Sequence, residues 1–257
     1  MFQILEIITL QQLGLATLVA VVAGFVKGVV GFAMPMVFVS GLSTFLAPEL
    51  ALAGLILPTL VANLMQAFRQ GPAAAWQSAK TFRVFLLVGL VTLFIGAQMV
   101  RLLPLWSMLL IIGLPVTLFA MLQLRGIEIK LKGQSTRIAA GVGAFAGFMG
   151  GLSGIWGPPT VAYLSALGTG KEDQMRVQGV IYGLGAVALT VAHYGSGVLR
   201  AQTLPLSLAM VLPAVLGMWM GGRIFDRIDQ VMFRRATLVI LLMAGLNLVR
   251  RAVMLLI

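Results

Sequence analysis

The chain has no cysteine and one histidine among its 257 residues, and its seven carboxylates are outnumbered by 18 lysines and arginines. Without cysteine it forms no disulfide, has no thiol nucleophile and offers no thiolate to a metal. So few histidines and carboxylates also disfavour a metal-ligand cluster. We therefore expect neither a metal nor another cofactor.

Charge is scarce as well. Charged residues make up 10% of the chain, against about 25% in soluble domains. Hydrophobic residues make up 60%, the mean hydropathy is +1.04, and apolar runs long enough for a transmembrane helix recur from end to end. The composition predicts an all-α polytopic membrane protein with little mass left for a catalytic domain. The net charge of +11 does not indicate nucleic acid, because the basic residues lie mostly in short loops, where they set membrane orientation.

Eight hydrophobic segments follow one another, four in residues 1–124 and four in residues 138–257, with a basic link at 125–137. We expect them at 13–46, 49–68, 82–100, 104–124, 136–167, 174–193, 204–222 and 232–250. The first and the fifth would each form a helix of about 50 Å, which is too long for a hydrocarbon core of about 30 Å. Each is expected to be two shorter helices joined by an unwound stretch, which survives at membrane depth only when it is buried in protein or lines a cavity.

The same phrase interrupts both long segments. Residues 23–35 read AGFVKGVVGFAMP and residues 146–158 read AGFMGGLSGIWGP, so both fit AGFxxGxxGxxxP at an offset of 123 residues. Gly/Pro-broken segments at corresponding places in two similar halves are the best sequence pointer to a transporter site at the bilayer midplane. The repeat therefore predicts two pseudo-symmetric halves with a site between the broken segments.

Loop charges distinguish two topologies. If all eight segments cross the membrane, the loop lysines and arginines divide ten against seven. If the first and fifth segments are re-entrant, they divide thirteen against four, and the four are Arg101, Arg200, Arg250 and Arg251. The second arrangement obeys the positive-inside rule better. It gives each half three crossings, which makes the halves inverted repeats, and it puts both termini outside.

The unwound stretches favour an anion site. Glycine lets a ligand approach the backbone, proline suits a first helical turn, and a helix N-terminus carries partial positive charge. Two such ends facing each other would form a cradle for a small anion; alternatively, the glycines only allow close helix packing. The candidates are Gly28, Gly31, Phe32 and Pro35 in the first copy, and Gly151, Ser153, Gly154, Trp156 and Pro158 in the second.

Lys27 lies inside the first copy among apolar residues, and an intramembrane cation is by default a functional-site candidate. An anionic substrate would neutralise it; alternatively, it snorkels to an interface or pairs with Glu49 or a backbone carbonyl. Its counterpart in the second copy is Gly150. Other polar side chains on the segments that follow would orient the anion or form interhelical hydrogen bonds. They are Asn63, Gln66, Gln178, Tyr182 and His193.

A protease and a channel are the alternatives to a carrier. Residues 151–154 read GLSG and Ala192-His193 follow, which superficially resembles rhomboid intramembrane proteases, with Ser153 as nucleophile and His193 as base. However, Ser196 stands where the AHxxG part of that signature requires glycine, and the repeat already explains Gly151 and Gly154. A passive anion channel would share the architecture of a carrier.

The whole chain resembles the TauE/SafE sulfite-exporter-like permeases, also called the four-toluene-sulfonate uptake permease family. The resemblance rests on the length, the two four-segment halves, both copies of the phrase, and the glycine-ended seventh segment (Gly221-Gly222-Arg223). It implies a carrier of small, often sulfur-containing anions such as sulfite or organosulfonates in the bacterial inner membrane, and not an enzyme. Lys27 departs from the family's first motif, which commonly has a small residue there, so it is expected to tune substrate choice.

The combined prediction is a carrier that works by alternating access, with one half or bundle rocking against the other. Its expected partners are the small anion and the lipid bilayer. The apolar outer surface also leaves room for a homodimer.

Overall fold

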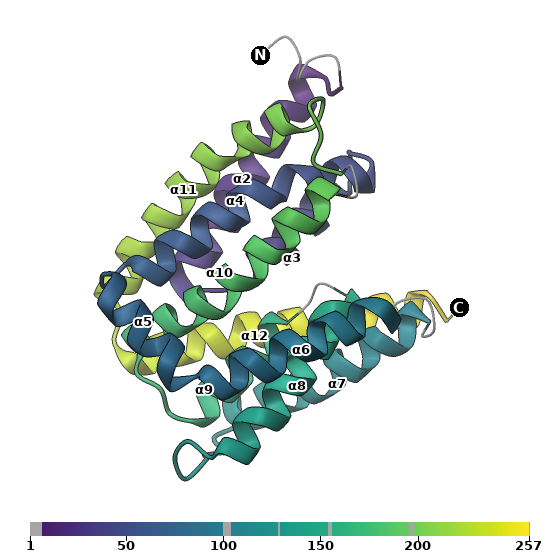
Figure 1. Ribbon diagram of the computed structural model, residues 1–257. Helices are drawn as coiled ribbons and strands as arrows, with labels where there is room; N and C mark the ends of the chain where they lie inside the picture. The colour runs from purple at the N-terminus through teal and green to yellow at the C-terminus, as the bar shows by residue number, and fades with distance from the viewer. Residues whose placement is uncertain (1–6, 100–103, 128, 154–155, 196–197, 257) are drawn as a thin grey trace. The chain divides into compact units, whose positions relative to one another are not determined.

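The computed structural model describes residues 7–99, 104–127, 129–153, 156–195 and 198–256, which contain eleven α-helices and no strand (Figure 1). This confirms the expected all-α class. The helices are α2 (Leu10–Val30), α3 (Met34–Leu42), α4 (Pro48–Phe68), α5 (Pro72–Thr81), α6 (Arg83–Met99), α7 (Leu105–Leu124), α8 (Thr136–Ser153), α9 (Gly157–Ala166), α10 (Lys171–Gly195), α11 (Leu204–Arg227) and α12 (Gln230–Met254).

Five of the described helices, α2, α4, α7, α11 and α12, are long and apolar enough to cross a membrane. The pair α5 and α6 passes the same test but is bent by 74°, which raises the number to six. The protein is therefore a multi-pass membrane protein. Each of the eight expected segments coincides with one helix or one helix pair, and the two long segments are the pairs α2–α3 and α8–α9.

The helices form two compact units. Unit 1 comprises Met1–Ala75 and Gln178–Ile228, and unit 2 comprises Trp76–Val177 and Asp229–Ile257. Each unit combines helices from both halves of the sequence: unit 1 contains α2, α3, α4, α11 and most of α10, whereas unit 2 contains most of α5, α6 to α9, and α12. The sequence halves and the compact units are thus two different divisions of the chain.

In unit 1, α2 runs alongside α11 in the same direction (Figure 1). The approach is close because glycines face backbone atoms of the partner helix. A Cβ on Gly24 would lie 2.0 Å from the carbonyl oxygen of Ala214, and one on Gly217 would lie 2.0 Å from that of Val21. Small residues allow such close contact between membrane helices, so these positions exclude any larger side chain without a backbone shift.

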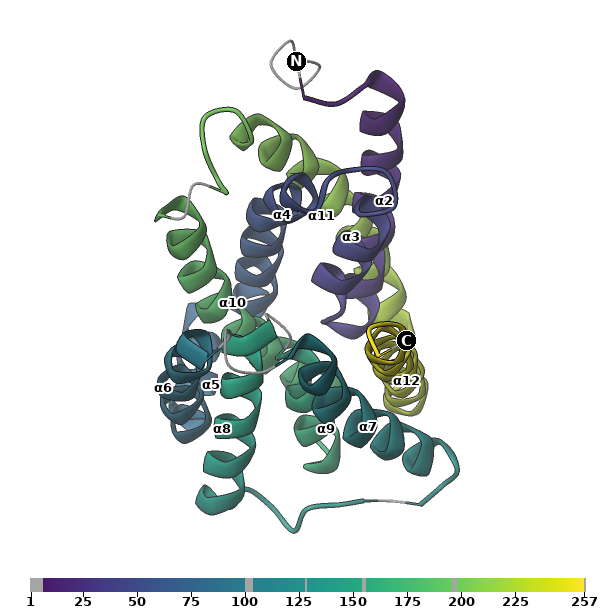
Figure 2. The same cartoon turned by 90° about the vertical axis from the view of Figure 1, so that its right-hand side faces the viewer.

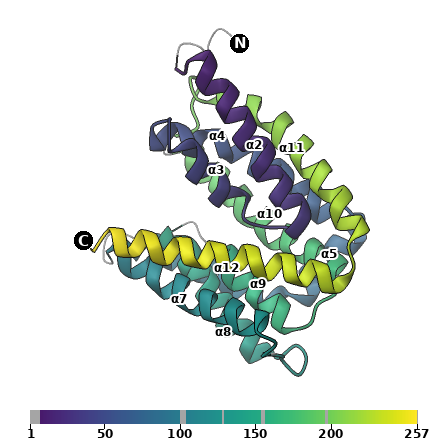
Figure 3. The same ribbon diagram turned by 180° about the vertical axis from the view of Figure 1, so that it is seen from behind.

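Unit 2 contains an equivalent pair, because α8 runs alongside α6 (Figure 2). A Cβ on Gly147 would lie 2.0 Å from the carbonyl oxygen of Gly89. Gly147 stands 123 residues after Gly24, at the corresponding place in the repeated phrase. The sequence repeat therefore reappears as a repeated helix-pairing geometry inside each unit. Unit 2 also contains the antiparallel pair α7 and α12 (Figure 3).

Both broken segments fold back on themselves. In the first, a Cβ on Gly41 of α3 would lie 2.7 Å from a methyl carbon of Val19, and Gln12 Nε2 donates to the carbonyl of Phe45 at 2.9 Å. In the second, the amide of Leu131, before α8, donates to the carbonyl of Ala166, at the end of α9, at 2.8 Å. Each short helix therefore returns toward the start of the long helix that precedes it.

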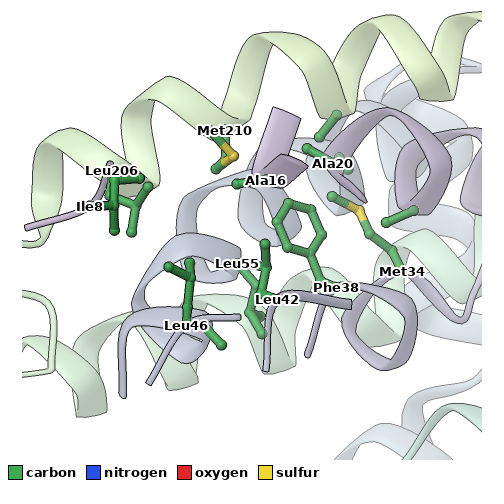
Figure 4. Close-up of a cluster of buried hydrophobic side chains, with 14 residues drawn as sticks. Ile8, Ala16, Ala20, Met34, Phe38, Leu42, Leu46, Leu55, Leu206 and Met210 are labelled. Carbon is green, nitrogen blue, oxygen red and sulfur yellow. The ribbon is translucent and has the colours of Figure 1, made fainter. Parts of the chain in front are cut away.

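Apolar side chains hold the returning helix α3 in place. Met34, Phe38 and Leu42 recur every four residues on one face of α3, and each is 0% exposed. They pack into a hydrophobic cluster with residues of α2, α4 and α11, among them Ala16, Ala20, Leu55, Leu206 and Met210 (Figure 4). Membrane helices associate by van der Waals packing and not by removal of apolar surface from water, so the close packing of this face stabilises the hairpin.

Candidate functional site: a buried lysine at the break between α2 and α3

The break between α2 and α3 spans residues 31–33, inside the first copy of the repeated phrase. Gly31 ends α2 with φ 84° and donates its amide to the carbonyl of Lys27 at 2.7 Å. Ala33 follows with φ 69°, a left-handed conformation that costs a residue with a Cβ about 1–2 kcal/mol. Pro35 then lies in the first turn of α3, where its missing N–H does no harm. The expected unwound stretch is therefore present in this segment.

Lys27 lies one turn before this break, and its side chain is 2% exposed. Its Nζ donates to the side-chain oxygen Oδ1 of Asn63 at 2.6 Å and to the carbonyl of Gly31 at 3.2 Å. The same nitrogen lies 5.8 Å from the centre of the Tyr182 ring, within range of a cation–π attraction. Lys27 thus contacts the break, α4 and α10 at once and does not snorkel to an interface.

The side-chain amides of α4 complete the arrangement. Asn63 Nδ2 donates to the backbone carbonyl of Tyr182 at 3.2 Å, and Gln66 Nε2 donates to the carbonyl of Gly31 at 3.1 Å. We call Lys27, Gly31, Asn63, Gln66 and Tyr182 the Lys27 cluster. All five were expected site residues, all five are buried, and all belong to unit 1. Gln178 is also buried, one turn before Tyr182 on α10.

No described residue pairs the Lys27 ammonium with a carboxylate. Glu49, the carboxylate considered from the sequence, is instead 2.7 Å from Arg200, and Asp226 pairs with Arg69. The ammonium therefore has only neutral neighbours: an amide oxygen, a backbone carbonyl and an aromatic ring. An ion buried without an opposite charge is costly. In its protonated form, Lys27 would therefore be a positive charge with no opposite charge beside it.

Two glycines that the sequence analysis did not single out bring α10 against α4. A Cβ on Gly179 would lie 2.4 Å from the backbone nitrogen of Ala67, and the nearest backbone atom to one on Gly183 is the carbonyl oxygen of Asn63 at 4.0 Å. Their spacing of four residues is the small-xxx-small pattern of close membrane-helix contacts. That pattern could have identified the contact between α10 and α4, which places Tyr182 in the cluster.

The other expected residues of the first copy lie outside the cluster. Gly28 lies against α11, where its Cβ would be 2.2 Å from the carbonyl oxygen of Met218. For this glycine, the structure supports the packing interpretation. Phe32 is buried within the break, and Pro35 is half-buried at the start of α3.

The second copy belongs to unit 2 and has a different arrangement. Trp156 directly precedes α9, and a Cβ on Gly150 would lie 2.5 Å from Cε3 of its indole ring. Gly150 is the counterpart of Lys27, so an aromatic ring lies where the first copy has a cation. Gly151 lies in the last turn of α8, and Pro158 is buried in α9. Gly154 and the side chains of Ser153 and His193 lie outside the described residues.

These features define a helical multi-pass membrane protein with a buried cation at a helix break. The family model for the sulfite exporter TauE/SafE matches residues 16–248. The chain therefore belongs to the TauE/SafE family, whose members are membrane transporters and not enzymes. A search of the curated proteins found no match, and neither did a search of the solved structures. Family membership confirms the resemblance seen in the sequence and weighs against the protease interpretation.

Proposed function

We propose that this transporter carries a small sulfur-containing anion, such as sulfite or an organosulfonate, across a bacterial inner membrane, and that the anion binds at the Lys27 cluster. The observation that carries the proposal is the buried ammonium with only neutral partners. The family description supplies the sulfur chemistry, and the buried charge supplies a reason for an anion to bind.

The hydrogen bonding of Lys27 leaves capacity for a ligand. An ammonium has three N–H donors, and two of them are directed at Gly31 and Asn63. The third N–H would donate to an oxygen of the anion. A charge-assisted hydrogen bond of this kind is about twice as strong as a neutral one, so a single such bond together with charge neutralisation anchors the anion.

The same cluster supports a carrier over an open channel. Its side chains are between 0% and 5% exposed, with Gln66 at the lower limit and Tyr182 at the upper. A continuous aqueous pore through the cluster would expose these groups. We therefore infer alternating access, in which the site opens to one side of the membrane at a time.

Contacts inside the units support re-entrant first and fifth segments. Glu49, at the start of α4, forms an ion pair with Arg200, and Arg69, at the end of α4, forms one with Asp226. The two ion pairs therefore mark the two ends of unit 1. Because α3 returns to the level of Gln12, α2 and α3 together would not cross, and neither would α8 and α9. Each half then has three crossings and the halves are inverted repeats. The positive-inside rule then places both termini in the periplasm.

Ligand-dependent thermal stability of the detergent-purified protein tests the proposal. Sulfite, sulfoacetate, taurine, thiosulfate and short carboxylates would be compared. A bound ligand at a hundredfold excess over its Kd stabilises the fold by about 2.7 kcal/mol. We expect a rise in Tm with a sulfonate or sulfite, lost in Lys27→Met and kept in Lys80→Met, whose lysine is exposed on α5. An equal shift in Lys27→Met would contradict the proposed site, and the absence of any shift would contradict the substrate class.

A further inference from the structure

We infer that the Lys27 cluster selects monovalent anions: it takes sulfite in its protonated form, hydrogensulfite, or a monovalent sulfonate, and rejects dianions such as unprotonated sulfite or sulfate. The inference rests on the proposed function and specifies the charge of its substrate. It follows from the number of charges at the site and from the orientation of the dipoles around Lys27.

The site holds one formal charge. In its protonated form Lys27 contributes one positive charge, and its partners Asn63, Gly31 and Tyr182 are neutral. A monoanion would bring the buried site to zero net charge. A dianion would leave one negative charge in the same dry surroundings, and a buried unpaired charge is strongly unfavourable.

No other charged residue of unit 1 within the described chain contacts Lys27, whose partners are Gly31, Asn63 and Tyr182. The charged residues of unit 1 other than Lys27, within the described chain, lie at helix ends or in connections. They are Glu49, Arg69, Arg200, Arg223, Asp226 and Arg227. Four of them form the two ion pairs Glu49–Arg200 and Arg69–Asp226, each of which has no net charge.

The dipoles around Lys27 also disfavour a second negative charge. The carbonyl of Gly31 and the Oδ1 of Asn63 direct their negative ends at the ammonium, and an aromatic face is negative as well. The amides of Asn63 and Gln66 each already donate to a backbone carbonyl. A dianion would thus meet several negative groups and few free donors.

The repeat does not provide a second cation. The counterpart of Lys27 is Gly150, and the ring of Trp156 lies against it. The two copies of the phrase therefore hold a single lysine between them, which keeps the charge of the site at one.

Methanesulfonate and sulfate test the inference directly, because they differ little in size and by one charge. Isothermal titration calorimetry on the detergent-purified full chain would measure both affinities at one pH. We expect methanesulfonate to bind at least about tenfold more tightly, which corresponds to about 1.4 kcal/mol. Equal or tighter binding of sulfate would overturn charge selection. If neither these anions nor sulfite binds, the proposed function itself fails.

Sulfite provides an independent test, because its monoanion loses a proton near neutral pH. Its affinity would be measured at mildly acidic and mildly alkaline pH and divided by that of methanesulfonate, whose charge is constant over this range. Dividing the two affinities cancels the effect of pH on the protein's own ionisable groups, which acts on the binding of both anions. We expect it to fall in proportion to the hydrogensulfite fraction. A constant quotient would show that both forms bind, which contradicts the inference.

A substitution that changes the charge of the Lys27 cluster also tests whether the cluster selects anions by charge. Asn63→Asp places a carboxylate where an amide oxygen now lies 2.6 Å from Nζ, so Lys27 would be neutralised internally. We expect loss of methanesulfonate binding with retained helical content. Asn247→Asp, beside Arg250 on α12, is the matched control and should bind normally. Unchanged binding in a folded Asn63→Asp variant would contradict the inference; should that variant not fold, the comparison of anions on the unmodified chain decides.

Discussion

Gly24 lies so close to Ala214 that a Cβ on the glycine would be 2.0 Å from the alanine's carbonyl oxygen. This contact assigns a physical role to the first glycine of the repeated phrase, which holds α2 against α11. Gly147 takes the same role between α8 and α6. The phrase therefore combines two kinds of glycine: those that allow helix contact, and Gly31, which ends α2 beside Lys27.

Replacing Gly24 with alanine is expected to destabilise the protein by about 1–3 kcal/mol, the usual cost of overpacking, because the obstructing atoms are backbone. Gly14→Ala on the same helix is the control: a Cβ there meets nothing within 4 Å, and alanine favours a helix interior by about 0.5–1 kcal/mol. The Tm of both variants in detergent checks this. Equal values would remove the packing role of Gly24.

Gly31→Ala is expected to weaken substrate binding about tenfold, or about 1.4 kcal/mol. A Cβ is strained at φ 84°, and relief of the strain would move the carbonyl that Lys27 and Gln66 contact. Gly126→Ala carries the same strain, since its φ is 85° and it has open space around it. The two variants should lose similar stability, but Gly126→Ala should bind and transport normally. Equal transport loss in both would show that strain alone is responsible.

In the second copy, Gly150→Ala is expected to destabilise the protein because the new Cβ would lie 2.5 Å from the Trp156 ring. In a Trp156→Ala background the same change should cost little. A double-mutant cycle on Tm measures the coupling, and contacting residues typically couple by about 0.5–3 kcal/mol. Additive effects would mean that Trp156 does not limit the size of residue 150.

Labelling of single introduced cysteines tests the topology, because the chain contains no cysteine of its own that would react. Ala201→Cys and Lys132→Cys each introduce one exposed thiol in a connection between helices. With outward termini, a membrane-impermeant maleimide should label Ala201→Cys in intact cells. Lys132→Cys should react only after permeabilisation. Labelling of both thiols, or of Lys132→Cys alone, in intact cells would rule out the proposed orientation.

Much of the local structure follows from local sequence signals. Thr9 and Gln12 form a capping box that starts α2, and glycine with proline marks the break between α2 and α3. Four polar residues of the Lys27 cluster were identifiable because polar groups are rare in such apolar segments. The separation of α5 from α6 and the contact of Gly179 with α4 were not anticipated, because no local pattern shows where a helix bends or which neighbour it meets.

The sequence by itself determined the helices, the two broken segments, the repeat and the presence of one lysine in an apolar run, because these depend on residues that are neighbours along the chain. Only the tertiary structure decided that Asn63, and not Glu49, is the partner of Lys27, and that α2 pairs with α11 while α8 pairs with α6. Lys27 and Asn63 are 36 residues apart, and Asn63 and Tyr182 are 119 apart. Helical periodicity carries no information over such separations, so close packing of whole helices determines which polar groups meet.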